Sequence, residues 1–190
     1  MGISLVTLNE YKTYIGINSP NQDTVINTII PKVSELVKSI CRRTFIDYLD
    51  EPKTEYFDGG DCLNLAEGPV VQILSVEQST NYGVAYTVLT EYTDWILKKT
   101  TEQIIPINPA GYFQDLINGY KVVYTAGYEN LPGDLKLAVL DLVTYYLNND
   151  AAVHSTKAPG TNSVQIEYIS TTNLPAHIKR VLDLYAMNYN

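Results

Sequence analysis

The sequence predicts an α+β fold, in which helices from both ends of the chain form a small bundle around a β-rich insertion. Apolar residues recur at spacings of three and four before residue 42 and after residue 132. Between them, short β-branched and aromatic runs are separated by Gly, Pro and Asn. We therefore expect one domain, with N-terminal helices in 1–50, a β-rich insertion in 53–127 and C-terminal helices in 131–190.

The N-terminal part has the signals of two helices. Thr7 and Glu10 have the spacing of a capping box, in which the two side chains satisfy exposed backbone amides. A longer helical pattern follows Asp23 and continues to Cys41. Pro31 lies inside it, so we expect either a kink or two abutting segments, because the proline ring removes a backbone donor and crowds the preceding turn.

The middle of the chain contains seven expected strands, each bounded by turn residues. Asp58-Gly59-Gly60-Asp61 is expected to form a hairpin turn between the first two, because glycine reaches the positive φ angles of tight turns. The predicted strands are Thr54–Asp58, Cys62–Ala66, Val70–Gln78, Val84–Thr90, Asp94–Leu97, Gln103–Ile107 and Tyr120–Thr125.

The C-terminal part is expected to contain two more helices. The first starts at Pro132 and has apolar residues on more than one face, so it must be covered on several sides, by its own domain or by a neighbouring subunit. Small and turn-forming residues from Asp150 to Ser163 predict a mobile loop. Alternation from Val164 to Ile169 predicts a strand, and Pro175 starts the last helix.

The composition limits the classes of partner. Thirteen Lys and Arg against 21 Asp and Glu give a net charge of −8, which argues against tight binding of a phosphate backbone. The longest stretch without these charges has 13 residues, whereas a membrane-spanning helix needs about 20 apolar ones. Sixteen Tyr against 3 Phe and 1 Trp favour half-exposed surfaces such as interfaces.

No enzymatic motif stands out, so we expect a non-enzymatic protein without a cofactor. The sequence has no nucleophile elbow and no glycine-rich phosphate loop. A zinc site built from Cys41, Cys62, His154 and His177 lacks paired ligand spacing, and we expect no metal. The two cysteines are expected to be reduced thiols, although the sequence leaves a disulfide between them open.

Two groups of residues support alternative functions. Asp58, Asp61 and Glu67 have the chemistry of a small hydrolase, although carboxylates beside a Gly-Gly turn usually cap backbone amides. Four aromatic residues would suit a carbohydrate-binding or host-recognition β module if they formed an exposed strip, whereas cross-strand packing is their commoner role. They are Tyr82, Tyr86, Tyr92 and Trp95.

Two segments carry a family resemblance. Cys62–Val76 has the pattern of a hairpin with a proline at its corner, and Lys121–Tyr128 leads through a proline into an apolar helix. In this order, after two N-terminal helices and before a Leu-Pro helix, they resemble the head-tail connector family of tailed bacteriophages, also called adaptors or head-completion proteins. The matched residues are scaffold positions without a catalytic role: Leu63, Leu65, Pro69, Val70, Ile73, Val76, Tyr124, Ala126, Gly127, Tyr128, Pro132, Lys136 and Ala138.

The resemblance implies a structural protein of the virion neck, assembled in the bacterial host cytoplasm. Its copies would form a ring, typically of twelve, that joins the portal vertex of the capsid to the tail and extends the DNA channel. The implied partners are other copies, the portal protein and the next neck or tail-completion protein. Genome DNA would pass through without tight binding, which the acidic composition favours.

We expect the contacts with the portal or neck to come from the predicted mobile loop and the last helix, because such elements order on a partner during assembly. The candidate interface residues are Val153, His154, Lys157, Pro159, Tyr185 and Tyr189.

Overall fold

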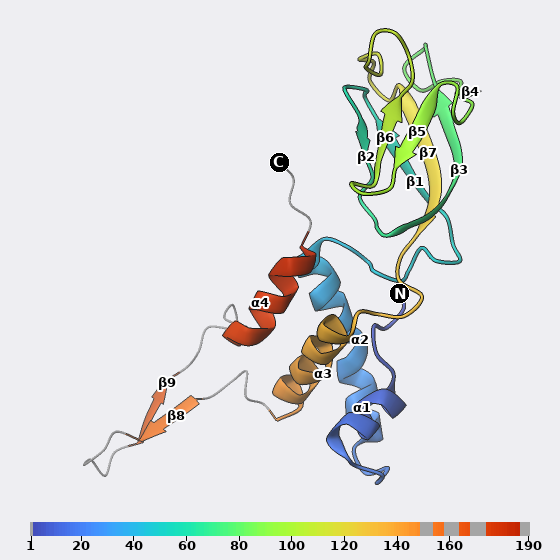
Figure 1. Ribbon diagram of the computed structural model, residues 1–190. Helices are drawn as coiled ribbons and strands as arrows, with labels where there is room; N and C mark the ends of the chain where they lie inside the picture. Colours follow the sequence, from blue (N-terminus) through green and yellow to red (C-terminus); the bar gives the residue numbers. More distant parts are fainter. Residues whose placement is uncertain (1, 149–153, 158–163, 168–173, 187–190) are drawn as a thin grey trace. The chain divides into compact units, whose positions relative to one another are not determined.

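The computed structural model describes residues 2–148, 154–157, 164–167 and 174–186 (Figure 1). The chain divides into two compact units. The helical unit comprises residues 1–42 and 131–190, and the β unit comprises residues 43–130. Helices thus occupy both ends of the chain and strands its middle, which confirms the predicted α+β class.

The helical unit begins with α1 (Leu8–Ile15), and the capping box predicted at its start is present. The amide of Glu10 donates to Oγ1 of Thr7 at 3.3 Å, and the amide of Thr7 donates to Oε2 of Glu10 at 2.7 Å. The helix ends at Gly16, which adopts a left-handed conformation with φ of 70°. Capping interactions at both ends of this short helix therefore satisfy its exposed backbone groups.

The longer helices supply the core of the helical unit. Pro31 lies inside α2 (Asp23–Cys41), which continues as one helix through it. This helix packs against α3 (Gly133–Leu147) and α4 (Ala176–Tyr185). The buried side chains of α3 lie on several faces, as its apolar sequence predicts: Leu135, Ala138, Val139, Leu140, Leu142 and Val143.

Between α3 and α4 the structure differs from the sequence expectation. Four residues of the predicted mobile loop form strand β8 (His154–Lys157), which pairs antiparallel with β9 (Val164–Glu167). The remaining loop residues lie outside the described residues. Strand β8 was not recognisable in the sequence because its residues are mostly short and polar. A two-stranded hairpin need not bury one face, so its strands need no alternation of apolar residues.

The β unit consists of two antiparallel sheets, ordered β1-β7-β3-β4 and β2-β6-β5 (Figure 1). Every predicted strand overlaps an observed one, and the bounds of the third agree. The observed strands are β1 (Lys53–Phe57), β2 (Leu63–Asn64), β3 (Val70–Gln78), β4 (Thr87–Val88), β5 (Trp95–Lys98), β6 (Gln103–Pro106) and β7 (Tyr120–Ala126).

The predicted hairpins are wrong. Strand β1 pairs with β7 and β2 pairs with β6, so the Asp58–Asp61 turn connects the two sheets. Gly59 is required there because a Cβ would lie 2.4 Å from the carbonyl oxygen of Gln114. Strands β2 and β3 do not pair either, and Pro69 at their corner follows a cis peptide bond. Turn residues mark where the chain reverses, whereas the partner of each strand depends on distant segments.

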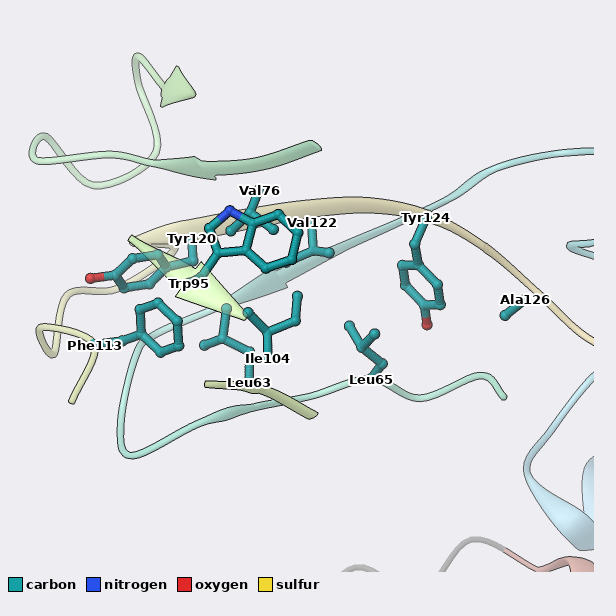
Figure 2. Close-up of a cluster of buried hydrophobic side chains, with 10 residues drawn as sticks. All are labelled: Leu63, Leu65, Val76, Trp95, Ile104, Phe113, Tyr120, Val122, Tyr124 and Ala126. Atoms are coloured by element: carbon teal, nitrogen blue, oxygen red, sulfur yellow. The ribbon is translucent and has the colours of Figure 1, made fainter. Parts of the chain in front are cut away.

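Side chains from both sheets meet in one buried cluster (Figure 2). Alternate residues of the central strand β7 point into it, from Tyr120 to Ala126. Five of the predicted scaffold residues belong to the cluster, and Val70 and Ile73 pack against it. The cluster comprises Leu63, Leu65, Val76, Trp95, Ile104, Phe113, Tyr120, Val122, Tyr124 and Ala126.

Gly127 lies directly after β7, where two chain segments approach closely. Its amide donates to the carbonyl of Pro69 at 2.8 Å, and the next amide, of Tyr128, donates to the carbonyl of Phe45 at 2.7 Å. Its φ is 130°, and a Cβ would lie 2.6 Å from the Phe45 oxygen. Glycine is therefore needed for both the backbone angle and the close approach.

We expect Gly127→Ala to lower the free energy of unfolding of the β unit by about 3 kcal/mol, because it combines a strained φ with a steric clash. Urea unfolding followed by the fluorescence of Trp95 measures this. Gly111→Ala is the matched control, since Gly111 has a φ of 73° but open space around its Cβ position. It should cost about 1 kcal/mol. Equal losses in the two variants would contradict the role of the Phe45 contact.

Candidate functional site

The carboxylates considered for hydrolase chemistry have structural partners. Oδ1 of Asp58 accepts a hydrogen bond from the amide of Asn118 at 2.8 Å. Glu67 is buried, and its Oε2 accepts from the amide of Thr44 at 2.9 Å. Asp61 is exposed. Asp58 and Glu67 thus cap backbone amides, which is the commoner role of such residues near turns.

Glu67 also belongs to a polar cluster at one end of the β-unit core. Nζ of Lys53 lies 2.7 Å from Oε1 of Glu55 and 3.5 Å from Oε1 of Glu67. Burial alone would lower the pKa of Lys53, but the hydrogen bond to Glu55 and the two negative charges outweigh it and raise that pKa. The amide of Glu67 donates to the hydroxyl of Tyr124, whose pKa burial raises strongly. The cluster therefore remains a charged, hydrogen-bonded structural unit.

The aromatic residues do not form the strip that a carbohydrate platform requires. Trp95 is only 4% exposed and belongs to the core. Tyr86 is half-buried and packs against Tyr56, with ring centroids 6.3 Å apart. Tyr82 and Tyr92 are 67% and 72% exposed. The platform hypothesis was wrong because it required Trp95 to be exposed, whereas the side chain of this single tryptophan is buried in the core.

The two exposed tyrosines have an unusual backbone conformation. The φ angles of Tyr82 and Tyr92 are 59° and 62°, which is uncommon for bulky residues. Local hydrogen bonds hold both loops: Oγ of Ser79 accepts from the amide of Gly83 at 2.9 Å, and the amide of Tyr92 donates to the carbonyl of Trp95 at 2.8 Å. The β unit thus keeps two aromatic rings in solvent at some cost in backbone strain.

A hollow of about 400 Å³ opens near these loops. The hydroxyl of Tyr120 lines it and accepts hydrogen bonds from Nε2 of Gln78 at 3.1 Å and from the amide of Gln114 at 2.9 Å. Burial raises the pKa of Tyr120 despite these donors. Sequence analysis missed this site because its lining comes from four separate segments: Gln78, Leu89, Asp94, Asn108, Ala110, Tyr112, Phe113, Gln114 and Tyr120.

The candidate interface residues have diverse positions. The hydroxyl of Tyr185 on α4 donates to Oδ1 of Asp134 on α3 at 2.6 Å, and this bond lowers the pKa of Asp134. His154 and Lys157 are the first and last residues of β8. The other three candidates, Val153, Pro159 and Tyr189, lie outside the described residues.

The helical unit carries an apolar groove that sequence analysis did not single out. Its volume is about 280 Å³, and one turn after another of α2 lines it, opposite a tyrosine of α3. Every third or fourth residue of α2 takes part, which is the spacing of a second apolar stripe on this helix. The lining residues are Ile29, Lys32, Val33, Leu36 and Tyr146.

The described residues contain no group of three or more His, Cys, Asp or Glu side chains placed to hold a metal ion. Cys41 and Cys62 are reduced, and the buried thiol of Cys41 donates to the carbonyl of Leu182 at 3.5 Å. No helix within the described ranges is long and apolar enough to cross a membrane.

Comparison with known proteins identifies relatives over nearly the whole chain. The family model of the head completion protein matches residues 4–188. Curated proteins give no match. A chain in the neck of an empty gene transfer agent (GTA) particle, computed with C6 symmetry, is 15% identical with a TM-score of 0.60, and the alignment covers 98% of this chain and 91% of that one.

Two further solved structures have similar folds. A chain in the virion of the native GTA particle is 14% identical, with a TM-score of 0.60 and coverage of 98% of this chain and 91% of that one. A chain in the neck of the native particle, computed with C12 symmetry, is 13% identical, with a TM-score of 0.58 and coverage of 100% and 97%. At these identities the likeness shows a shared fold.

An ion pair on the outer face of the first sheet predicts a pH dependence. Nζ of Lys121 lies 3.0 Å from Oε2 of Glu77. Burial would raise the pKa of Glu77, but hydrogen bonds from Lys121 and Ser75 lower it below its ordinary value of 4.5. Because the folded pKa is depressed, the pair stabilises the β unit above pH 4.5, and this contribution is lost as the pH falls through the folded pKa.

We expect Glu77→Gln to destabilise the β unit at neutral pH and to weaken the further loss of stability below pH 4.5. Urea unfolding between pH 7 and pH 3, followed by tryptophan fluorescence, measures both effects. Glu91→Gln, which removes an exposed carboxylate without an ion pair among the described residues, is the control. Parallel pH profiles of Glu77→Gln and the unsubstituted protein would contradict the role of the pair.

Proposed function

Because this chain belongs to the head completion protein family, we propose that it is a structural protein of the neck of a tailed bacteriophage or a related particle. In this proposal its copies form a ring that joins the portal vertex to the tail and extends the DNA channel. The observation that carries it is the family match over residues 4–188. The fold shared with chains of GTA necks, computed with C6 and C12 symmetry, supports a cyclic ring, for which we propose twelve copies.

The surface of the helical unit supports contacts between copies. The groove along α2 is lined mainly by apolar side chains, and Leu137 on α3 is also exposed. Apolar area left in solvent commonly marks an interface. In a closed ring each copy uses two different surfaces, and the same modest contact is repeated around the ring. The ring is therefore stabilised by many weak contacts together.

The charge of the chain suits passage of DNA. A net charge of −8 provides few of the cationic phosphate contacts that hold DNA tightly. Genome DNA would therefore slide through the ring without strong binding.

We further propose that the β8–β9 hairpin and α4 contact the portal or the next neck or tail-completion protein. The two strands pair only with each other, and an isolated two-stranded hairpin is marginally stable in water. A partner surface would supply packing that stabilises such a hairpin. His154, Lys157 and Tyr185 are the described candidates for these contacts, and Val153, Pro159 and Tyr189 remain candidates outside the described residues.

Negative-stain imaging of the purified protein, alone and mixed with the portal assembly from its own source, tests the ring. We expect rings, or a new annular layer on the portal. The image gives the symmetry directly, which separates six-fold from twelve-fold assemblies. A protein that stays monomeric and also leaves the portal unchanged would contradict the proposal.

Replacing residues 154–167 with a short Gly-Ser linker tests the hairpin. We expect unchanged thermal unfolding, because β8 and β9 pair only with each other, and loss of the added layer on the portal. The matched control is a Gly-Ser replacement of residues 18–21, an exposed connection between α1 and α2. Normal portal binding without the hairpin would refute this contact while leaving the ring proposal standing.

A further inference from the structure

The hollow in the β unit has a one-sided charge. The chain segments around it, residues 79–97 and 107–120, contain three acidic residues and no Lys, Arg or His. Of these three, Asp94 lines the hollow. The cations that border these segments are Lys98 and Lys99, which begin four residues after Asp94 at the other end of β5, and Lys121, which is paired with Glu77. A positively charged group is therefore favoured at this site by the charges of its surroundings.

Hydrogen bonds to Thr90 fix the position of Asp94 and use one of its two carboxylate oxygens. Its amide donates to the carbonyl of Thr90 at 2.8 Å, and its Oδ2 accepts from the amide of Thr90 at 2.7 Å. Within the described part of the chain, Oδ1 accepts no hydrogen bond. Because this carboxylate is already fixed, binding a ligand in the hollow would cost little conformational entropy of the Asp94 side chain.

The other polar groups also favour a ligand that brings donors. Nε2 of Gln78 donates to the hydroxyl of Tyr120, and Oε1 of Gln78 remains as an acceptor. Nδ2 of Asn108 donates to the carbonyl of Tyr112 at 2.9 Å. Each of these two amide groups uses one of its N–H donors, while Oδ1 of Asp94 and Oε1 of Gln78 remain as acceptors. A guanidinium group has five N–H donors and no acceptor, so it can donate to both oxygens.

The walls fit the rest of an arginine side chain. Leu89, Tyr112, Phe113 and Tyr120 line the hollow. Figure 2 shows Tyr120 and Phe113 at one end of the buried cluster, with the Tyr120 hydroxyl pointing away from the other labelled side chains, and their ring centroids are 4.8 Å apart. Phe113 and Tyr120 are only 3% and 2% exposed, so Tyr112, which is 49% exposed, is the ring available to stack on a guanidinium group.

The neighbouring surface has the composition of a protein interface. Tyr92 lies two residues before Asp94, and both Tyr92 and Tyr82 are exposed on strained backbone. Interfaces are enriched in tyrosine and arginine, and strained residues cluster at ligand-binding loops. The occupant is therefore better matched by a side chain of a protein than by a free small molecule.

We propose that this hollow is a docking pocket for an arginine side chain of a partner protein, held by the carboxylate of Asp94 beside the ring of Tyr112. The pocket adds a specific contact that the ring proposal does not contain. Its chemistry stands on the β unit alone, and only the assignment of the partner to the neck rests on the proposed function.

Titration of the ¹⁵N-labelled full chain with N-acetyl-L-arginine amide tests the pocket. We expect saturable shifts of the amide signals of Thr90, Asp94 and Tyr112, with a millimolar dissociation constant. N-acetyl-L-citrulline amide has nearly the same shape without the charge, and it should bind at least about tenfold more weakly. Equal binding of the two compounds, or no saturable shift with either, would overturn the proposal.

Two variants assign the effect to one carboxylate. Asp94→Asn keeps an oxygen for the Thr90 amide, and it should weaken arginine amide binding about tenfold or more with unchanged thermal unfolding. Glu91→Gln removes a charge from the same loop outside the lining and should change the affinity about twofold or less. Equal affinities of Asp94→Asn and Glu91→Gln would overturn the assignment.

Imaging of Asp94→Asn separates this inference from the proposed function. The variant should still form rings. If the unsubstituted protein forms rings but does not prefer arginine amide to citrulline amide, the pocket is overturned and the neck assignment stands. If it binds arginine amide selectively but never forms rings, the pocket is supported and the ring is contradicted.

Discussion

The β unit depends on one strand, β7, which lies between β1 and β3 and buries every second side chain. At one end it carries Tyr120 to the hollow, and at the other it carries Tyr124 to the charged cluster around Glu67. Gly127 then permits the close approach to Phe45. A central strand of this kind couples both ends of the unit, because a one-residue shift in its register would move Tyr120 and Tyr124 to the opposite face of the sheet.

The polar groups of the β unit are arranged in two different ways. Around Glu67 each charge has a partner, so this cluster stabilises the fold and leaves little for a ligand. Around Asp94, which is half-buried, one carboxylate oxygen of Asp94 and the side-chain oxygen of Gln78 remain as acceptors. This contrast is the reason why we propose the hollow beside Asp94, and not the Glu67 cluster, as a binding site.

Local signals predicted the elements well. The Thr7 and Glu10 pair gave the correct start of α1, and a β-branched run bounded by turn residues gave the correct bounds of β3. The order of motifs from Cys62 to Tyr128 also led to the family that the match over residues 4–188 supports. The hairpin at Gly59 and Gly60 was wrong, and β8 was missed, because glycine pairs and short polar runs report local flexibility and say nothing about pairing partners.

The sequence by itself determined where helices and strands form, that the middle of the chain is β-rich, and which family the chain belongs to. These properties depend on residues close together in the chain. The tertiary structure alone decided the two-sheet pairing, the burial of Trp95 and the hollow beside Asp94. Each of these features forms where several chain segments, distant in sequence, pack together. The free energy that stabilises this arrangement comes from burial of side chains from all of these segments, and no local sequence pattern encodes it.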